Sequence, residues 1–375
     1  MRLLFLLGSG ISRPAGMSTT ERLTEQVLSG ENAMKYAGGY VVGEGPPANA
    51  WDAVDPHVLA LTRELHERAQ RFYAKYGDPR AANYEDIAFL ADQIASSLEF
   101  EYENPGLDPF VVELAGRLTS GDERELEHRA SAVRDYITGS IASLLRRPPG
   151  SLEHLKLIAD AAGDSNVDEL NIATLNHDTV LEQALAHFAV AFSDGFGDRI
   201  SDVSSAWTNA FPGPVRLLKL HGSVNWFRID WRGRQTTIRT AGDEWHLKDD
   251  QGNRLGSPAG TGPQLLAGTF NKILSYPSPV YLEQHARYRA ALDDADAVVV
   301  SGYSFGDKAI NTQLAGFLRD GSSRPFVVIH ADPKGVIAGA RGAIQNSVAS
   351  AGERCRGLCA WVQDVPWPDL LKVLS

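Results

Sequence analysis

Five short polar groups hold the residues of this chain that could do chemistry. They are Gly8-Ser9-Gly10, Asn176-His177-Asp178, His221-Gly222-Ser223, Gly302-Tyr303-Ser304 and His330-Ala331-Asp332. Histidine titrates near neutral pH, the asparagine amide both donates and accepts hydrogen bonds, and glycine lets a backbone approach a ligand closely. These residue types suit a site that binds a polar small molecule and moves a proton on it.

Each polar group follows a short apolar run, and helix-like patterns follow most of the groups. Apolar runs without alternation predict strands buried on both faces of a parallel sheet. The repeated order of strand, loop and helix predicts an α/β fold with a Rossmann-like, doubly wound parallel sheet. Ligands of such sheets bind beyond the carboxyl ends of the strands, so we expect the five groups at one edge. The expected strands are 2–7, 169–176, 215–220, 297–300, 325–329 and one near 358–362.

The sequence also predicts two insertions into a discontinuous core of about 1–35 and 166–375. Residues 55–163 keep apolar side chains at helical spacing and predict a large helical insertion. Residues 223–260 carry turn signals and predict a small hairpin insertion. The Gly- and Pro-rich residues 38–47 predict a loop, and Ser18 to Glu21 have capping-box spacing for a helix start.

Aromatic and basic residues alternate in the expected hairpins. The tryptophans are Trp226, Trp231 and Trp245, and the arginines are Arg228, Arg232 and Arg234. This mixture could stack on nucleic acid or face a partner protein. Cross-strand pairing of aromatic residues within a hairpin explains it more simply.

Composition limits the classes of function. The net charge of −11 argues against broad binding to nucleic acid or to anionic membranes. The two cysteines, Cys355 and Cys359, argue against a disulfide framework and are too few for a four-cysteine zinc site within one chain. No apolar run is long enough to span a membrane and no leader pattern is recognised, so we expect a cytoplasmic protein.

The first polar group is a candidate phosphate site. Gly8-Ser9-Gly10 could offer backbone and hydroxyl donors to phosphate oxygens, as glycine turns before helices do. Alone, the turn is equally consistent with an ordinary glycine turn of an α/β protein. Arg13 could pair with a phosphate or lie on the surface.

Four motifs in chain order resemble the sirtuin (SIR2) family, and most of all the bacterial SIR2-like branch found in antiviral defence. They are Gly8-Ser9-Gly10-Ile11-Ser12, Thr174-Leu175-Asn176-His177-Asp178, Lys219-Leu220-His221-Gly222 and Gly302-Tyr303-Ser304. The resemblance implies NAD+ as the substrate, which members of that branch cleave without deacetylating lysine. Sirtuin deacetylases usually carry two zinc-binding cysteine pairs after the His-Gly motif, whereas no cysteine lies between His221 and Gly302. We therefore expect no zinc, and an acyl-lysine peptide site is less favoured.

The resemblance implies a catalytic pair and a binding set. Asn176 would orient the attacking water or the ribose hydroxyls, and His221 would act as general base. Asp178 would hold the ribose or the nicotinamide amide, or instead cap the following helix. Alternation along an extended chain would turn His177 away from Asn176, so we expect it outside the site. The expected binding residues are Gly8, Ser9, Gly10, Ile11, Arg13, Asp178, Gly302, Ser304, His330 and Asp332.

The leading hypothesis is an NAD+ glycohydrolase that releases nicotinamide and ADP-ribose. The resemblance implies a regulated effector of antiphage defence that depletes NAD+ and is controlled by a partner chain such as a HerA-type ATPase. We also expect a homo-oligomer. The alternatives are an NAD-dependent deacylase or ADP-ribosyltransferase, and a non-catalytic sensor of NAD or ADP-ribose. The presence of both Asn176 and His221 argues against the sensor, because binding alone needs no base.

Overall fold

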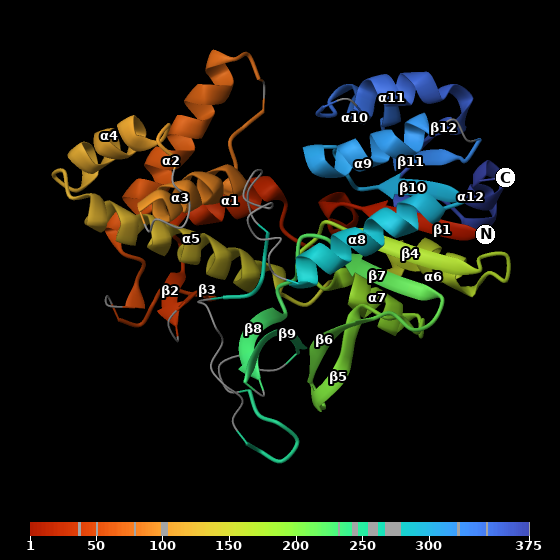
Figure 1. The fold of residues 1–375 in the computed structure, drawn as a ribbon, viewed down its shortest axis with the longest axis horizontal. Helices are drawn as coiled ribbons and strands as arrows, with labels where there is room; N and C mark the ends of the chain where they lie inside the picture. Colours follow the sequence, from red (N-terminus) through yellow and green to blue (C-terminus); the bar gives the residue numbers. More distant parts are fainter. Residues whose placement is uncertain are drawn as a thin grey trace.

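A six-stranded parallel sheet, on the right in Figure 1, organises the protein in a computed structural model. The structure describes residues 1–36, 39–49, 52–78, 80–98, 104–231, 233–241, 247–253, 262–266, 279–320, 323–342 and 344–374. The spatial order of the strands is β12-β11-β10-β1-β4-β7, and every neighbouring pair is parallel. The strands are β1 (Arg2–Leu7), β4 (Glu169–Thr174), β7 (Val215–Lys219), β10 (Ala297–Ser301), β11 (Phe326–His330) and β12 (Cys355–Cys359).

Helices cover both faces of this sheet, which confirms the predicted doubly wound α/β fold. Leu3, Phe5 and Leu7 of β1 face one hydrophobic core, while Leu4 and Leu6 face a second core on the other side. All five side chains are fully buried, and each contributes about 1.5–3 kcal/mol to folding. The first core is covered by α6 (Lys156–Gly163), α7 (Val180–His187) and α12 (Trp367–Leu374). The second is covered by α8 (Pro279–Asp294), α9 (Lys308–Arg319) and α11 (Ile344–Ala351).

A separate block of helices lies beside the sheet and has a hydrophobic core of its own (Figure 1). Its helices are α1 (Thr20–Ser29), α2 (Pro56–Lys75), α3 (Tyr84–Leu98), α4 (Asp108–Leu118) and α5 (Glu123–Leu145). The residues predicted as a loop include β3 (Gly39–Val42), which pairs with β2 (Ala33–Tyr36). This hairpin packs on α5, where a Cβ on Gly139 would lie 2.3 Å from the carbonyl oxygen of Tyr40.

A four-stranded antiparallel sheet follows α7 and is larger than the predicted hairpins. Its strand order is β5-β6-β9-β8. The strands are β5 (Gly195–Ser201), β6 (Ser204–Ala210), β8 (Trp226–Trp231) and β9 (Arg234–Thr240). Trp226 is fully buried, with its ring centroid 5.1 Å from that of Phe196, so it packs inside the protein and offers no stacking surface. Arg232 and Trp245 lie outside the described residues.

Two element boundaries differ from the sequence prediction. The last strand is Cys355–Cys359, whereas the expected run near 358–362 enters a short 3-10 turn over Val362–Asp364. An edge strand needs few buried side chains, so hydrophobicity does not locate it. Helix α1 is capped by Thr19, whose side chain accepts from the Arg22 N–H, one residue beyond the expected Ser18. In the described part of the chain no helix has the length and apolar character to cross a membrane.

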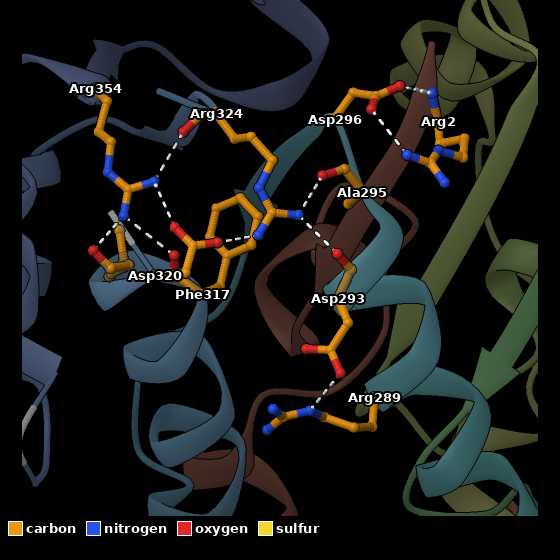
Figure 2. Close-up of polar contacts among 10 residues, drawn as sticks. Arg2, Arg289, Asp293, Ala295, Asp296, Phe317, Asp320, Arg324 and Arg354 are labelled. Carbon is orange, nitrogen blue, oxygen red and sulfur yellow. Dashed lines mark hydrogen bonds and ion pairs between the residues drawn. The ribbon is translucent and has the colours of Figure 1, made fainter. Parts of the chain in front are cut away.

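A network of arginines ties together the amino ends of the central strands (Figure 2). Arg324 donates to the carbonyl oxygens of Asp293 and Ala295 at 2.8 and 2.7 Å, and its guanidinium lies 4.5 Å from the Phe317 ring centroid. Arg354 also donates to the carbonyl oxygen of Phe317 at 3.1 Å. These bonds fix α8 and α9 to the sheet at the edge opposite the polar groups.

Candidate functional site

The loops after β1 and β10 meet where the strand order of the sheet reverses. From β1 the chain adds β4 and β7 on one side and then returns to β10 on the other. The N–H of Gly8 donates to the carbonyl oxygen of Ser301 at 3.1 Å, and the N–H of Gly10 donates to that of Gly302 at 2.9 Å. Such a reversal is where open α/β sheets bind ligands.

The glycines at this junction allow two backbones to touch. A Cβ on Gly8 would lie 2.6 Å from the carbonyl oxygen of Gly302, and one on Gly302 would lie 2.5 Å from the Ile11 nitrogen. Gly302 also has a φ of +64°, which disfavours other residues. The expectation that Gly8 and Gly10 donate to phosphates is therefore wrong for their N–H groups, which bond within the protein.

A cavity of about 430 Å³ opens beyond the carboxyl ends of the strands, between the sheet and the helical block. This volume is within the range of small-molecule sites. Its wall on the sheet side includes Gly8, Ser9, Ser12, Asn176, His177, Asp178, His221, Gly302, Tyr303, Ser304, Gly306, Asp307, Gly339 and Arg341. Its wall on the other side includes Met17, Ser18, Thr20, Leu23, Arg80, Ala81, Asn83, Tyr84, Glu85, Asp86 and Leu145.

Seven of the expected site residues line this cavity, and the structure places the others outside its lining. The seven are Gly8, Ser9, Asn176, Asp178, His221, Gly302 and Ser304. Gly10 and Ile11 lie in the turn behind the wall, and Arg13 is exposed. His330 accepts from the N–H of Asp332 at 2.9 Å, and the Asp332 carboxylate caps α10 (Pro333–Ala338) by accepting from the Gly335 N–H. This pair therefore shapes a turn and the start of α10.

His221 is paired with a carboxylate that sequence reasoning missed. Its Nε2 lies 3.2 Å from Oδ2 of Asp307, and the two side chains are only 8% and 12% exposed. The other carboxylate oxygen of Asp307 accepts from the N–H groups of Ala309 and Ile310 at the start of α9. The carboxylate is thus held in place, and it can orient the imidazole and compensate the charge of a bound proton.

The loop that carries Asp307 is fixed by Tyr303. The Tyr303 hydroxyl accepts from the Asp307 N–H at 3.1 Å and donates to Oδ1 of Asn311 at 2.9 Å. Burial raises the pKa of Tyr303 well above its ordinary value, so the hydroxyl stays protonated. Asn311 in turn donates to the carbonyl oxygens of Phe305 and Arg341.

A second polar network holds Asn176. Its Nδ2 donates to the Ser12 hydroxyl at 3.0 Å, and that hydroxyl hydrogen-bonds the Asp178 carboxylate. All three side chains are buried, and burial raises the pKa of Asp178 although Lys219 and the Val180 N–H oppose the shift. Ser12 accepts from one N–H of the amide, so Oδ1 and the second N–H of Asn176 can meet a ligand. Ser12 stood in the first motif, but no role was expected for it.

The Asp178 carboxylate serves the helix as well as the network. Its Oδ1 accepts from the Val180 N–H at 3.0 Å, so capping is part of its role. The fully buried Lys219 donates to the Asp178 carbonyl oxygen and to Oε1 of Glu182, the latter at 2.8 Å. These bonds fix the chain directly after β4.

His177 lies in the cavity wall, contrary to the expectation from alternation. The chain leaves the extended conformation after Thr174, so the two-residue alternation of a strand no longer applies. The His177 and His221 ring centroids are 6.2 Å apart. Among the described residues no cluster of three His, Cys, Asp or Glu could hold a metal ion. Burial raises the pKa of the Cys355 thiol to about 11.

Comparison with known proteins supports the resemblance over part of the chain. Solved structures similar to this chain include a Sir2 homolog–NAD complex (15% identity over 94% of this chain and 88% of that one, TM-score 0.35) and Sir2Tm bound to a propionylated peptide (11%, 96% and 89%, TM-score 0.37). Likenesses of this strength add nothing to the topology described above. No curated protein matches. Residues 170–346 match the family model of the SIR2-like domain, which supports the SIR2-like family for the segment that contains Asn176, His221 and Asp307.

Proposed function

We propose that this protein is an NAD+ glycohydrolase that uses Asn176 and His221. The observation that supports this most is the placement of the His221–Asp307 pair and the Asn176–Ser12–Asp178 network on one cavity wall. The His221–Asp307 pair can accept a proton, and the network that holds Asn176 can position water or a ribose hydroxyl. Hydrolysis of a glycosidic bond requires both functions.

The reaction divides between these groups. The bond between ribose and nicotinamide breaks, and its electron pair leaves with nicotinamide as a neutral molecule. Water held by Oδ1 of Asn176 adds to the ribosyl carbon, and its proton passes to His221, where Asp307 compensates the charge. The products are nicotinamide, ADP-ribose and one proton.

The SIR2-like resemblance extends this proposal to the role of the enzyme. An NAD+ glycohydrolase in the cytoplasm would act as an effector of antiphage defence by depleting NAD+. Such an activity harms the cell that contains it and needs restraint. We propose a homo-oligomer that is controlled by a partner chain such as a HerA-type ATPase, with no zinc and no direct binding to nucleic acid.

The test is to incubate the purified protein with NAD+, alone and with candidate partners, and to follow nicotinamide and ADP-ribose by chromatography. Asn176→Ala and His221→Ala should each lower nicotinamide release by roughly 10²-fold or more. His187→Ala is the matched control, because His187 is an exposed histidine on α7. Unchanged turnover in both site variants would overturn the mechanism.

Three other outcomes of the same experiment point to the alternatives. Tight NAD+ binding without turnover under any condition would identify a sensor. Nicotinamide release that requires an acylated peptide would identify a deacylase, and transfer of ADP-ribose to a protein would identify a transferase.

A further inference from the structure

The N–H groups of Gly8 and Gly10 in the glycine turn are used within the protein, while Ser9 of the same turn lines the cavity but carries no positive charge. The Gly8 and Gly10 N–H groups bond to the loop after β10, and the Ile11 N–H bonds to the carbonyl oxygen of Gly8. A dinucleotide carries two negative charges on its diphosphate, and these need cationic partners in a partly buried site. Other residues of the wall must therefore supply them.

Two arginines line the cavity from parts of the chain that the motifs do not cover. Arg80 lies in the segment between α2 and α3 of the helical block, and Arg341 follows α10 on the sheet side. Both are partly buried, so both remain reachable from the cavity. Arginine suits diphosphates because its planar guanidinium can donate two parallel hydrogen bonds.

Arg80 is held in place before any ligand arrives. Its guanidinium lies 3.6 Å from the centroid of the Tyr73 ring, and its Nε lies 3.0 Å from the Asp78 carboxylate. The Tyr73 hydroxyl is itself bonded to the buried carboxylate of Asp86. Arg341 is anchored through its backbone, whose N–H donates to Phe305 and whose carbonyl oxygen accepts from Asn311.

The carboxylates of the wall are mostly engaged by other groups. Asp86 accepts from Tyr73 and from the Asn83 N–H, Asp178 from Ser12 and Val180, and Asp307 pairs with His221. Glu85 also lines the cavity on the side of the helical block. None of these bonds is to Arg80 or Arg341; Arg80 contacts Asp78 through Nε, so its other guanidinium nitrogens can donate to an anion.

We infer that Arg80 and Arg341 bind the diphosphate of the dinucleotide. Through Arg80, the helical block then contributes to a ligand site that is otherwise built on the sheet. This inference rests on the proposed function for the identity of the substrate. It assigns to Arg80 and Arg341 the role that the sequence had suggested for Arg13.

The test measures KM for NAD+ and, by titration calorimetry, the affinity for ADP-ribose, which carries the diphosphate but is not cleaved. Arg80→Ala and Arg341→Ala should each raise the KM for NAD+ and lower the affinity for ADP-ribose by roughly 10-fold or more, while kcat stays nearly constant. Arg80→Lys should recover part of the affinity through its charge. Arg289→Ala is the matched control, because Arg289 is an exposed arginine of α8 that is not among the residues lining the cavity.

The outcomes separate the two claims. Unchanged KM and unchanged ADP-ribose affinity in well-folded variants would overturn the inference, and so would a loss of kcat at constant KM. If the wild type binds ADP-ribose but cleaves no NAD+, the proposed function fails. Weaker ADP-ribose binding by the arginine variants would still support the inference.

Discussion

Nε2 of His221 and Oδ2 of Asp307 are 3.2 Å apart and join the loop after β7 to the start of α9. His221 follows β7 and Asp307 follows β10, and these two strands are separated in the sheet by β4 and β1. Only the fold brings them together, and their contact gives the first prediction.

Asp307→Asn should lower kcat for nicotinamide release by roughly 10²-fold, because the amide cannot compensate a proton on His221. Folding should be preserved, since asparagine caps a helix about as well as aspartate. Single-turnover kinetics measure the effect, and circular dichroism checks the fold. A kcat equal to that of the wild type would remove Asp307 from the mechanism.

Gly302→Ala should destabilise the protein by more than the backbone strain alone. A left-handed conformation costs a non-glycine residue about 1–2 kcal/mol, and the new Cβ would also meet the Ile11 nitrogen at 2.5 Å. Gly342→Ala is the control, because Gly342 has a φ of +77° and nothing lies within 4 Å of its Cβ position. Urea unfolding compares the two, and equal losses would mean that the loop contact is unimportant.

His154 should make stability depend on pH. Its Nε2 lies 2.8 Å from the carbonyl oxygen of Ile11, and burial lowers its pKa in the folded protein. The unfolded chain then binds a proton more readily, so this contribution is complete above pH of about 6.5 and decreases as the pH falls toward the lower folded pKa.

Comparison with His154→Gln isolates this effect, because glutamine can still donate to Ile11 but does not titrate. The difference in the free energy of unfolding between wild type and variant should shrink as the pH is lowered from 8 to 5. A difference that stays constant over this range would contradict the assignment to His154.

Arg324→Ala should cost about 2–3 kcal/mol of stability without altering the cavity. The variant removes two charge-assisted hydrogen bonds to the Asp293 and Ala295 carbonyl oxygens and the contact with Phe317 (Figure 2). Arg289→Ala, which removes an exposed pair within α8, should cost less than about 0.5 kcal/mol. Chemical unfolding distinguishes them, and equally small losses would contradict the structural role of Arg324.

The central sheet could be predicted from sequence because its inner strands are apolar on both faces. The run from Leu3 to Leu7 has no other stable environment in a chain of this composition. The pair β5 and β6 was missed, since strands with many polar residues resemble exposed turns. The predicted bounds of β12 were about three residues too far along the chain, because an edge strand buries few side chains.

The site was predicted in part for a related reason. Residues directly after strands, such as Asn176 and His221, share one edge by topology alone. Asp307 was missed because it lies six residues after the end of β10 and has the pattern of a helix cap. Arg80 and Arg341 come from connections whose position depends on how the helical block packs, and local patterns carry no signal for that.

The cavity is lined from two parts of the protein, the sheet and the helical block, that have separate hydrophobic cores. This arrangement has a thermodynamic consequence. The helical block is joined to the sheet side at Arg146, which donates to the carbonyl oxygen of Val224 at 2.8 Å. A ligand that touches both walls must be released before either part can melt. At 100 times its Kd it would add about 2.7 kcal/mol to each. Saturation should therefore raise the melting temperature of both parts.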